Sequence, residues 1–362
     1  MKDIRDLVVE FVRQPVVAMP PAVSVERAKE TYGFDSIIKM CSNENPLGVS
    51  PMAVEAMKDE IANICFYADP EPENALKAKV AKKIGVTPQH IMITSGAAFA
   101  LNFVGEVFIQ GRDEAILSSP TYPPYYSIIQ KNGGRVVDVP MTSDLGFDFD
   151  GIVNAVTGKT KVIFICNPNN PTGCTVYRDT MLEFVNRIPE DVILVMDEAY
   201  VQFSKDPDAL TMVPEILTRK NIIVIQTFSK LYGMAGIRVG YAVSTPEIIS
   251  FMQRASIARS LNTVGIRGAL AALDDEDFAK KTIDNNAIGR NYLSEEFTKL
   301  GYKVYPSESN FIYVDIKGDP KEISRKLLPF GIIIRGDFPY LRISIGTSDQ
   351  NEKLVKAIKA IQ

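Results

Sequence analysis

One lysine in this sequence stands where its side chain could do covalent chemistry. Lys230 ends residues 227–230 (TFSK), directly after the apolar run at residues 221–226. Arg238 follows within the glycine-rich residues 233–240 (GMAGIRVG). A lysine amine can form a Schiff base with an aldehyde, and an arginine can bind a phosphate through paired donors. Pyridoxal phosphate carries both an aldehyde and a phosphate, so these residues predict this cofactor.

Three further motifs precede this lysine, each at the predicted end of a strand. Residues 94–98 (TSGAA) lead into a predicted helix, whose first backbone N–H groups can bind a phosphate. Residues 167–173 (NPNNPTG) form an irregular turn that can present an asparagine amide to a ligand. Residues 197–200 (DEAY) place Asp197 where a buried carboxylate needs a cation, such as a protonated pyridine nitrogen. A turn or a helix cap would explain each motif alone, but not all of them together.

The elements that must position these residues alternate between strands and helices. Seven strands are predicted, at residues 91–95, 114–118, 135–139, 162–166, 192–197, 222–227 and 238–243. Helices are predicted between them, for example at residues 97–110, 123–132 and 178–187. This alternation predicts an α/β fold with a largely parallel, doubly wound sheet.

A different pattern begins after about residue 261. Two helices (263–273 and 277–300) precede predicted strands at 303–305, 311–316, 332–335 and 341–345 and helices at 319–328 and 348–361. This mixture predicts a smaller α+β domain. We therefore expect a large cofactor-binding domain at residues 46–260, and a second unit made of an N-terminal arm (1–45) and a small C-terminal domain (261–362).

Composition excludes several other classes of protein. The chain has 362 residues, 46% of them hydrophobic and 23% charged, and a net charge of −4, which gives no basic surface for nucleic acid or anionic membrane. The N-terminus has no apolar signal core. Its single histidine, His90, argues against a histidine metal centre or a Ser-His-Asp triad, and no metal is expected. The cysteines form no CxxC pair and predict reduced thiols in a cytoplasmic protein: Cys41, Cys65, Cys166 and Cys174.

Taken in order, the motifs resemble those of the fold-type I aminotransferases that use pyridoxal phosphate. Residues 42–48 (SNENPLG), Tyr67 and residues 341–346 (LRISIG) make the chain most similar to class II and its histidinol-phosphate aminotransferase branch. The resemblance implies the fold-type I architecture, a mostly parallel seven-stranded sheet with helices on both faces plus a smaller α+β domain. It also implies a homodimer whose two active sites are shared between subunits.

The resemblance assigns catalysis to Lys230, Asp197 and Tyr200. It assigns the cofactor contacts to Tyr67, Gly96, Ala97, Ala98, Tyr122, Asn170, Asp197, Tyr200, Ser229, Lys230 and Arg238. Lys230 would hold the cofactor as a Schiff base and move the substrate proton. Asp197 would keep the pyridine nitrogen charged.

The other cofactor contacts fall on the ring and the phosphate. Asn170 and Tyr200 would bond the phenolic oxygen of the cofactor, while Tyr122 would stack on its ring. The phosphate would be bound by Ser229, Arg238 and the backbone around Gly96 and Ala97. Tyr67 matches a position that reaches this phosphate from the neighbouring subunit.

Substrate contacts are implied for three residues. Arg342 matches the arginine that binds the substrate α-carboxylate, Arg335 matches a cation for a substrate phosphate, and Asn170 is assigned to the substrate as well as to the cofactor. The chain departs from the family at Ala98 and Phe99, where an acidic pair is usual, and at residues 16–21, where a tyrosine is often found.

The leading hypothesis is transfer of an amino group from histidinol phosphate to 2-oxoglutarate. An aromatic amino acid aminotransferase and a decarboxylase of a phosphorylated amino acid such as threonine phosphate remain as alternatives, since both would keep the cofactor residues. A nucleotide-dependent dehydrogenase is disfavoured, because no GxGxxG motif follows an early strand. A non-catalytic binding protein would have no use for Lys230.

Overall fold

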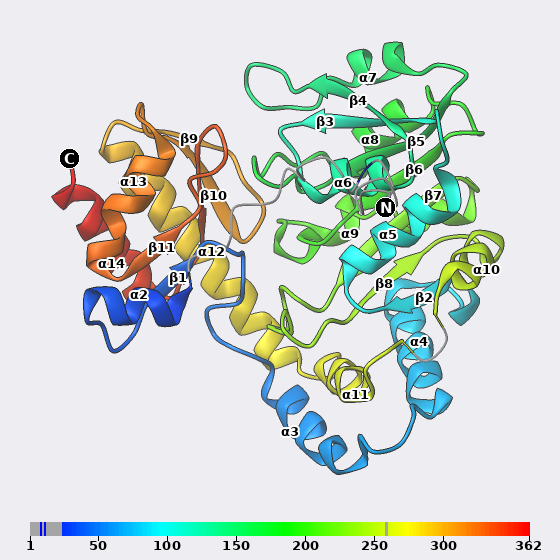
Figure 1. Cartoon of the computed structure of the whole chain (residues 1–362), viewed down its shortest axis with the longest axis horizontal. Coiled ribbons are helices and arrows are strands. Elements are labelled where there is room, and N and C mark those ends of the chain that lie inside the picture. The colour runs from blue at the N-terminus through cyan, green and yellow to red at the C-terminus, as the bar shows by residue number, and fades with distance from the viewer. Residues whose placement is uncertain (1–7, 9–10, 12–23, 258–259) are drawn as a thin grey trace, which may run out of the picture.

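A seven-stranded sheet forms the larger part of the molecule (Figure 1). The computed structural model describes residues 8, 11, 24–257 and 260–362, so the tyrosine-free segment 16–21 lies outside the described residues. The strand order is β2 (Ile91–Thr94), β8 (Gly240–Val243), β7 (Ile222–Thr227), β6 (Ile193–Asp197), β5 (Thr160–Cys166), β3 (Glu114–Ser119) and β4 (Arg135–Pro140). Only β8 runs antiparallel to its neighbours in this sheet, which confirms the prediction of a mostly parallel α/β fold.

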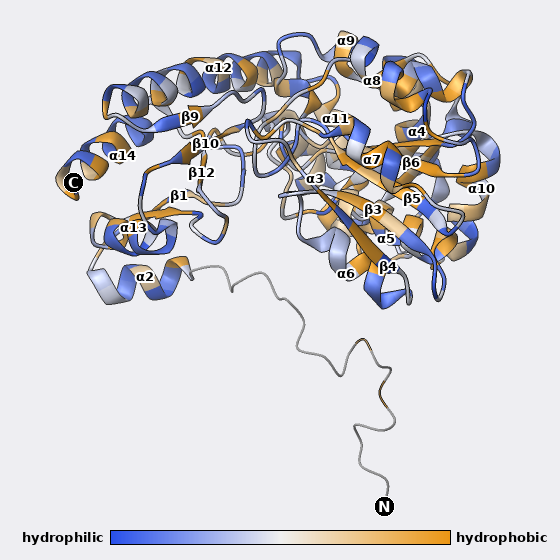
Figure 2. Cartoon of the chain, turned by 90° about the horizontal axis from the view of Figure 1, so that it is seen from above, coloured by the Kyte–Doolittle hydropathy of each residue, from blue (hydrophilic) through white to orange (hydrophobic). Residues whose placement is uncertain are grey.

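Helices cover both faces of this sheet because its central strands are apolar on both sides. In β7, Ile222 and Val224 face one hydrophobic core, whereas Ile223 and Ile225 face another. The first core is covered by α4 (Pro70–Ile84), α7 (Phe149–Ala155), α8 (Arg178–Val185) and α11 (Thr263–Ala272). The second is covered by α5 (Ala97–Phe108), α6 (Pro124–Lys131) and α10 (Pro246–Ala255). Figure 2 shows the strands between these layers as predominantly hydrophobic.

A smaller part combines two short sheets with helices. β9 (Lys303–Tyr305), β10 (Phe311–Asp315) and β12 (Leu341–Ser344) are antiparallel, while β1 (Ile38–Met40) pairs in parallel with β11 (Ile332–Ile334). They are packed by α2 (Val25–Tyr32), α12 (Glu276–Lys299), α13 (Pro320–Leu327) and α14 (Ser348–Ala360). Because β1 comes from the N-terminal segment, both ends of the chain build this part.

Helix α12 connects the two parts (Figure 1). Its residues Ala279 and Ile283 pack against the core of the larger part, whereas Leu293 and Phe297 belong to the core of the smaller part. Helix α11 lies beyond residue 260, the predicted end of the larger domain, and yet it packs on α3 (Pro51–Glu60) and α4. Packing therefore extends the larger part as far as the first turns of α12, while the division into two domains stays a prediction.

One predicted strand begins later than expected. Residues 238–243 read as a strand, but β8 starts at Gly240, because Arg238 has a left-handed backbone (φ 62°) that ends strand geometry. The short elements are η2 (Ile61–Asn63), η3 (Pro88–His90), η4 (Val201–Phe203), α9 (Pro207–Leu210), η5 (Val213–Leu217) and η6 (Leu328–Phe330). Within the described residues, none of the helices combines the length and the apolar character needed to span a membrane.

Candidate active site

The predicted motifs meet at the carboxyl ends of three neighbouring strands. β5 ends at Cys166, β6 at Asp197 and β7 at Thr227, and parallel pairing places these ends at one edge of the sheet. A cavity of about 150 Å³ opens there. Its walls include Ala97, Ala98, Tyr122, Asn170, Asp197, Tyr200, Ser229, Lys230 and Arg238. The structure thus brings together nearly all the residues that the sequence nominated for the cofactor.

Lys230 sits in the loop directly after β7. Its Nζ donates to the carbonyl oxygen of Ser42 at 3.2 Å and lies 5.7 Å from the ring centre of Tyr200. Burial, followed by the positive charge of Arg342, lowers the pKa of the lysine amine to about 8. The amine is therefore uncharged far more often at neutral pH than an exposed lysine would be, which suits a nucleophile.

Asp197 is almost fully buried, and a tyrosine that the sequence analysis did not select holds it in place. The hydroxyl of Tyr125 donates to Asp197 Oδ2 at 2.7 Å, and the Ala199 N–H donates to Oδ1 at 3.2 Å. Burial raises the pKa of the carboxyl, while the Tyr125 hydrogen bond opposes this rise. The Tyr125 ring stacks on Phe164 at 5.0 Å, so the sequence alone does not distinguish it from an ordinary core aromatic.

Two asparagines converge on the hydroxyl of Tyr200. Asn170 Nδ2 lies 3.2 Å and Asn43 Nδ2 lies 3.1 Å from this oxygen. Because the hydroxyl accepts from both amides, its own proton is left for a ligand in the cavity. Asn43 belongs to the motif at residues 42–48, but the motif alone does not predict this contact.

Arg342, near the middle of β12, reaches the same cluster from the smaller part. Its Nη1 donates to Asn170 Oδ1 and its Nη2 to the Cys41 carbonyl oxygen, both at 2.6 Å. Its Nε is buried and has no hydrogen-bond partner within the described residues. Burial lowers the pKa of this guanidinium. A buried cation with an unused donor favours an anionic ligand.

The end of the cavity that is lined by Arg238 is shaped for an anion such as a phosphate. Gly96 caps helix α5 with φ 91°, and a Cβ at this position would come within 2.5 Å of the Arg238 Nη2 atom. Glycine therefore lets the guanidinium approach the helix N-terminus closely. The hydroxyls of Thr227 and Ser229 lie 2.9 Å apart, and Ser229 also lines the cavity. Backbone N–H groups, a hydroxyl and an arginine are the donors that a phosphate binds.

Tyr67 and Arg335 do not line the cavity, whereas Tyr122 does. Tyr122 lines the cavity, and burial raises the pKa of its hydroxyl to about 12. Tyr67 lies between η2 and α4 with 80% of its surface exposed, and it does not line the cavity within this chain. Arg335 does not line the cavity either. Its guanidinium pairs with the carboxylate of Asp337 through two hydrogen bonds.

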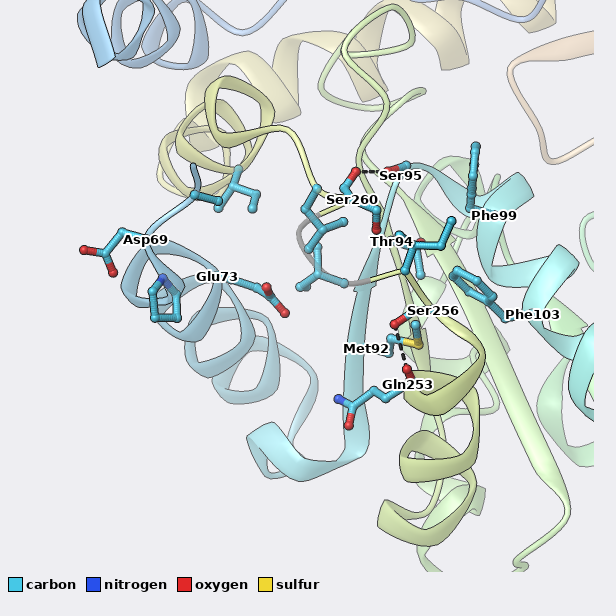
Figure 3. Close-up of a pocket in the computed structure, with 16 residues that line it drawn as sticks. Asp69, Glu73, Met92, Thr94, Ser95, Phe99, Phe103, Gln253, Ser256 and Ser260 are labelled. Carbon is cyan, nitrogen blue, oxygen red and sulfur yellow. Dashed lines mark hydrogen bonds between the residues drawn. The ribbon is translucent and has the colours of Figure 1, made fainter. Parts of the chain in front are cut away.

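A second cavity, of about 440 Å³, lies beside the first turn of α5 (Figure 3). It is lined by Ser95 and Phe99 as well as by Asp69 and Glu73 on the side of α4. None of the catalytic candidates lines this cavity, and acidic side chains at its wall would repel a phosphate. The chemistry is therefore assigned to the cavity that contains Lys230.

Comparisons with known proteins agree with this geometry. Residues 35–358 match the model of the family described as aminotransferase class I and II. A histidinol-phosphate aminotransferase from Moorella thermoacetica is 38% identical over 360 residues, covering 96% of this chain and 92% of that protein. Another from Brevibacillus brevis is 34% identical, covering 94% of each chain. The structure of histidinol-phosphate aminotransferase from Sinorhizobium meliloti in complex with pyridoxal-5′-phosphate has a TM-score of 0.87 and 28% identity, covering 97% of this chain and 100% of that one.

The chain therefore belongs to the aminotransferase class I and II family. This confirms the family to which the motifs point. Within that family, it is similar to histidinol-phosphate aminotransferases over nearly its whole length.

Replacing Tyr125 with phenylalanine should impair turnover without unfolding the core. The variant loses the O–H that stabilises the charged Asp197, so the pKa of that carboxyl rises further. The acidic limb of the pH profile of kcat/KM should move to higher pH, and kcat/KM should fall about 10- to 100-fold, as expected for loss of a hydrogen bond to a charged group.

Tyr126→Phe is the matched control, since its hydroxyl donates to Asp138 at 2.7 Å and does not contact Asp197. Steady-state kinetics across pH compares the two variants. An unchanged acidic limb in Tyr125→Phe would show that the tyrosine does not tune Asp197.

Proposed function

We propose that this protein is a pyridoxal 5′-phosphate-dependent aminotransferase that transfers an amino group from histidinol phosphate to 2-oxoglutarate. The observation that carries the proposal is the convergence of Lys230, Asp197 and Arg342 on one buried cluster. The sequence similarity to histidinol-phosphate aminotransferases supports the choice of substrate.

The cavity fits the cofactor at both of its ends. The donors around Gly96, Ser229 and Arg238 suit its phosphate, while Asp197 suits a protonated ring nitrogen, because a buried carboxylate is costly without a cation. Between them, the Tyr200 hydroxyl has a proton to donate to a ring oxygen. When bound, the cofactor supplies an aldehyde that condenses with amines and a ring that withdraws electrons from the substrate Cα.

In this proposal, the chain's own groups bind the substrate and move its proton. Lys230 would take the proton from the substrate Cα and hold it at its Nζ for return, which its lowered pKa of about 8 allows near neutral pH. Arg342 binds the α-carboxylate of 2-oxoglutarate, since histidinol phosphate has no carboxylate, with the buried Nε as the unused donor. Asn170 fixes the guanidinium at 2.6 Å and so orients this contact.

Arg335 is the candidate cation for the substrate phosphate. Its guanidinium is largely shielded from solvent and pairs with Asp337, with one of the two contacts at 2.8 Å. A phosphate bound there must compete with this carboxylate. The pairing therefore favours a second candidate function, transamination of an aromatic amino acid that carries no phosphate.

Turnover of two amino donors separates these candidates. The holoenzyme with 2-oxoglutarate should form glutamate from histidinol phosphate with kcat/KM at least about tenfold higher than from phenylalanine, a difference of ~1.4 kcal/mol. The Lys230→Ala variant should show no turnover. It should also lack the cofactor colour that hydride reduction bleaches in the unaltered enzyme. Rapid reaction of phenylalanine with none of histidinol phosphate would establish the second candidate, and release of carbon dioxide from a phosphorylated amino acid would point to the decarboxylase.

Asp337→Asn should strengthen recognition of the phosphate. The substitution keeps the shape of the side chain and removes the charge that competes for Arg335. We expect KM for histidinol phosphate to fall about tenfold, equivalent to ~1.4 kcal/mol, with little change for phenylalanine.

The control for this prediction is Glu322→Gln, which removes the carboxylate of an exposed ion pair with Lys326 on α13. Steady-state kinetics with both donors gives the comparison. A higher KM for histidinol phosphate in Asp337→Asn would instead mean that the carboxylate orients Arg335 for the phosphate.

We further propose a homodimer in which Tyr67 completes the active site of the neighbouring subunit. Exposed apolar side chains surround this residue in sequence, including Ile61, Ile64 and Phe66 at 55%, 61% and 74% exposure. Such a concentration of exposed apolar surface is typical of an interface. Within its own chain, Tyr67 does not line the lysine cavity.

Mixing two inactive variants tests the shared site. Lys230→Ala and Tyr67→Ala should each be impaired as purified dimers. After mild unfolding and refolding together, mixed dimers would contain one intact site, restoring about a quarter of wild-type activity if subunits pair randomly. No recovery, although mixed dimers are shown by mass spectrometry, would place Tyr67 in its own subunit's site or outside it.

We also propose that the protein acts in the cytoplasm. All four cysteines are free thiols, and two of them, Cys41 and Cys166, are buried. Free thiols without structural disulfides fit a reducing compartment.

A further inference from the structure

The segment that follows β1 reaches two groups of the lysine cavity. The carbonyl oxygen of Ser42 accepts a hydrogen bond from Lys230 Nζ at 3.2 Å. The side chain of Asn43 donates from its Nδ2 to the Tyr200 hydroxyl at 3.1 Å. The first contact is made by the backbone, so most residues could make it. Only the contact of Asn43 depends on the identity of the side chain.

The backbone of Asn43 is held in a conformation that few residues adopt. Its φ of 54° lies in the left-handed region, where glycine and asparagine are tolerated best. Its N–H donates to Ser344 Oγ at 2.8 Å, and its carbonyl oxygen accepts from Asn310 Nδ2 at 2.9 Å. The residue is 1% exposed. The smaller part of the molecule therefore fixes Asn43 on both sides of its side chain.

Ser344 determines which way the amide of Asn43 faces. Its Oγ accepts the N–H of Asn43, so the serine keeps its own proton for donation, and it donates to Asn43 Oδ1 at 2.9 Å. With Oδ1 engaged in this way, the amide nitrogen is the atom that faces Tyr200. Since an amide NH₂ only donates, the Tyr200 oxygen must accept this hydrogen bond.

The second asparagine on this hydroxyl is oriented in the same manner. Arg342 Nη1 donates to Asn170 Oδ1 at 2.6 Å, which leaves Asn170 Nδ2 to donate to Tyr200 at 3.2 Å. Arg342 and Ser344 are two positions apart on β12, so their side chains lie on the same face of the strand. One strand of the smaller part thus orients both donors.

Two donors on the Tyr200 oxygen leave its own proton for the cavity. None of the described residues accepts a hydrogen bond from this hydroxyl, and Tyr200 lines the cavity that contains Lys230. Burial raises the pKa of the hydroxyl, so it keeps its proton at neutral pH. The ionisable groups that act on it most strongly are Arg342, Cys166 and Tyr122. None of these is a carboxylate that would draw the proton away from the cavity.

We propose that Asn43 and Ser344 are positioning residues that direct the proton of the Tyr200 hydroxyl toward the ring oxygen of the bound cofactor. These roles rest on the cofactor site proposed above and not on the identity of the amino donor. A hydrogen bond donated to the ring oxygen stabilises negative charge there. The nitrogen that joins Lys230 to the cofactor then binds its own proton less tightly.

The visible absorbance of the holoenzyme, followed across pH, tests these roles without any substrate. Asn43→Gly removes the donor and suits the left-handed backbone. The midpoint of the absorbance change should rise by about one pH unit, a tenfold change in proton affinity. In a Tyr200→Phe background, the same substitution should add no further rise, because the hydroxyl through which Asn43 acts is absent.

Two results would overturn the proposal: an unchanged midpoint in Asn43→Gly, or a rise of the same size in the Tyr200→Phe background. A lower melting temperature with an unchanged midpoint would show that Asn43 only anchors its segment. A wrong amino donor would not affect this measurement. By contrast, an unaltered protein without visible absorbance would refute the cofactor site itself, and the positioning roles with it.

Ser344→Ala provides a second, milder test that still applies if Asn43→Gly does not fold. The amide of Asn43 loses the donor that orients it, so the midpoint should rise in the same direction. Ser309→Ala is the matched control, since this buried hydroxyl bonds to Ser307 Oγ at 2.8 Å and does not contact Asn43. The control should leave the midpoint unchanged. Equal midpoints in the two serine variants would contradict the role of Ser344.

Discussion

Burial of three ionisable groups in one cluster is the constraint on which the active site depends. The amine of Lys230, the carboxyl of Asp197 and the guanidinium of Arg342 are all buried. Burial lowers the pKa of the amine and of the guanidinium and raises the pKa of the carboxyl, so it favours the neutral form of each group. Isolated buried charges are costly, so the site is stabilised most when ligands of opposite charge are bound. A cofactor with a protonated ring and substrates with carboxylates provide those partners.

The architecture supplies this cluster from segments that are far apart in the chain. The parallel strands β5, β6 and β7 deliver Asp197 and the lysine loop to one edge, and β12 of the smaller part delivers Arg342. Helix α12 packs in both hydrophobic cores and so couples the two parts.

Substrate choice depends on a finer balance than cofactor binding. The end of the lysine cavity near Arg238 contains several independent donors, so no single one of them would decide whether a phosphate binds. The candidate phosphate contact rests mainly on Arg335, which is paired with Asp337 in the absence of substrate. Whether this carboxylate competes with a phosphate or positions the arginine determines which amino donor is preferred.

The sequence by itself determined the seven strands of the larger sheet and the family, and it nominated most of the residues that line the lysine cavity, because strand ends and glycine turns are encoded locally. It did not reveal Tyr125 or Asn43, whose partners lie 72 and 157 positions away in the chain. Nor did it reveal the packing of α11 on the larger core. Hydrogen bonds between distant residues and the burial that shifts their pKa values exist only after the chain has folded, so the tertiary structure alone decided how the nominated groups are held and charged.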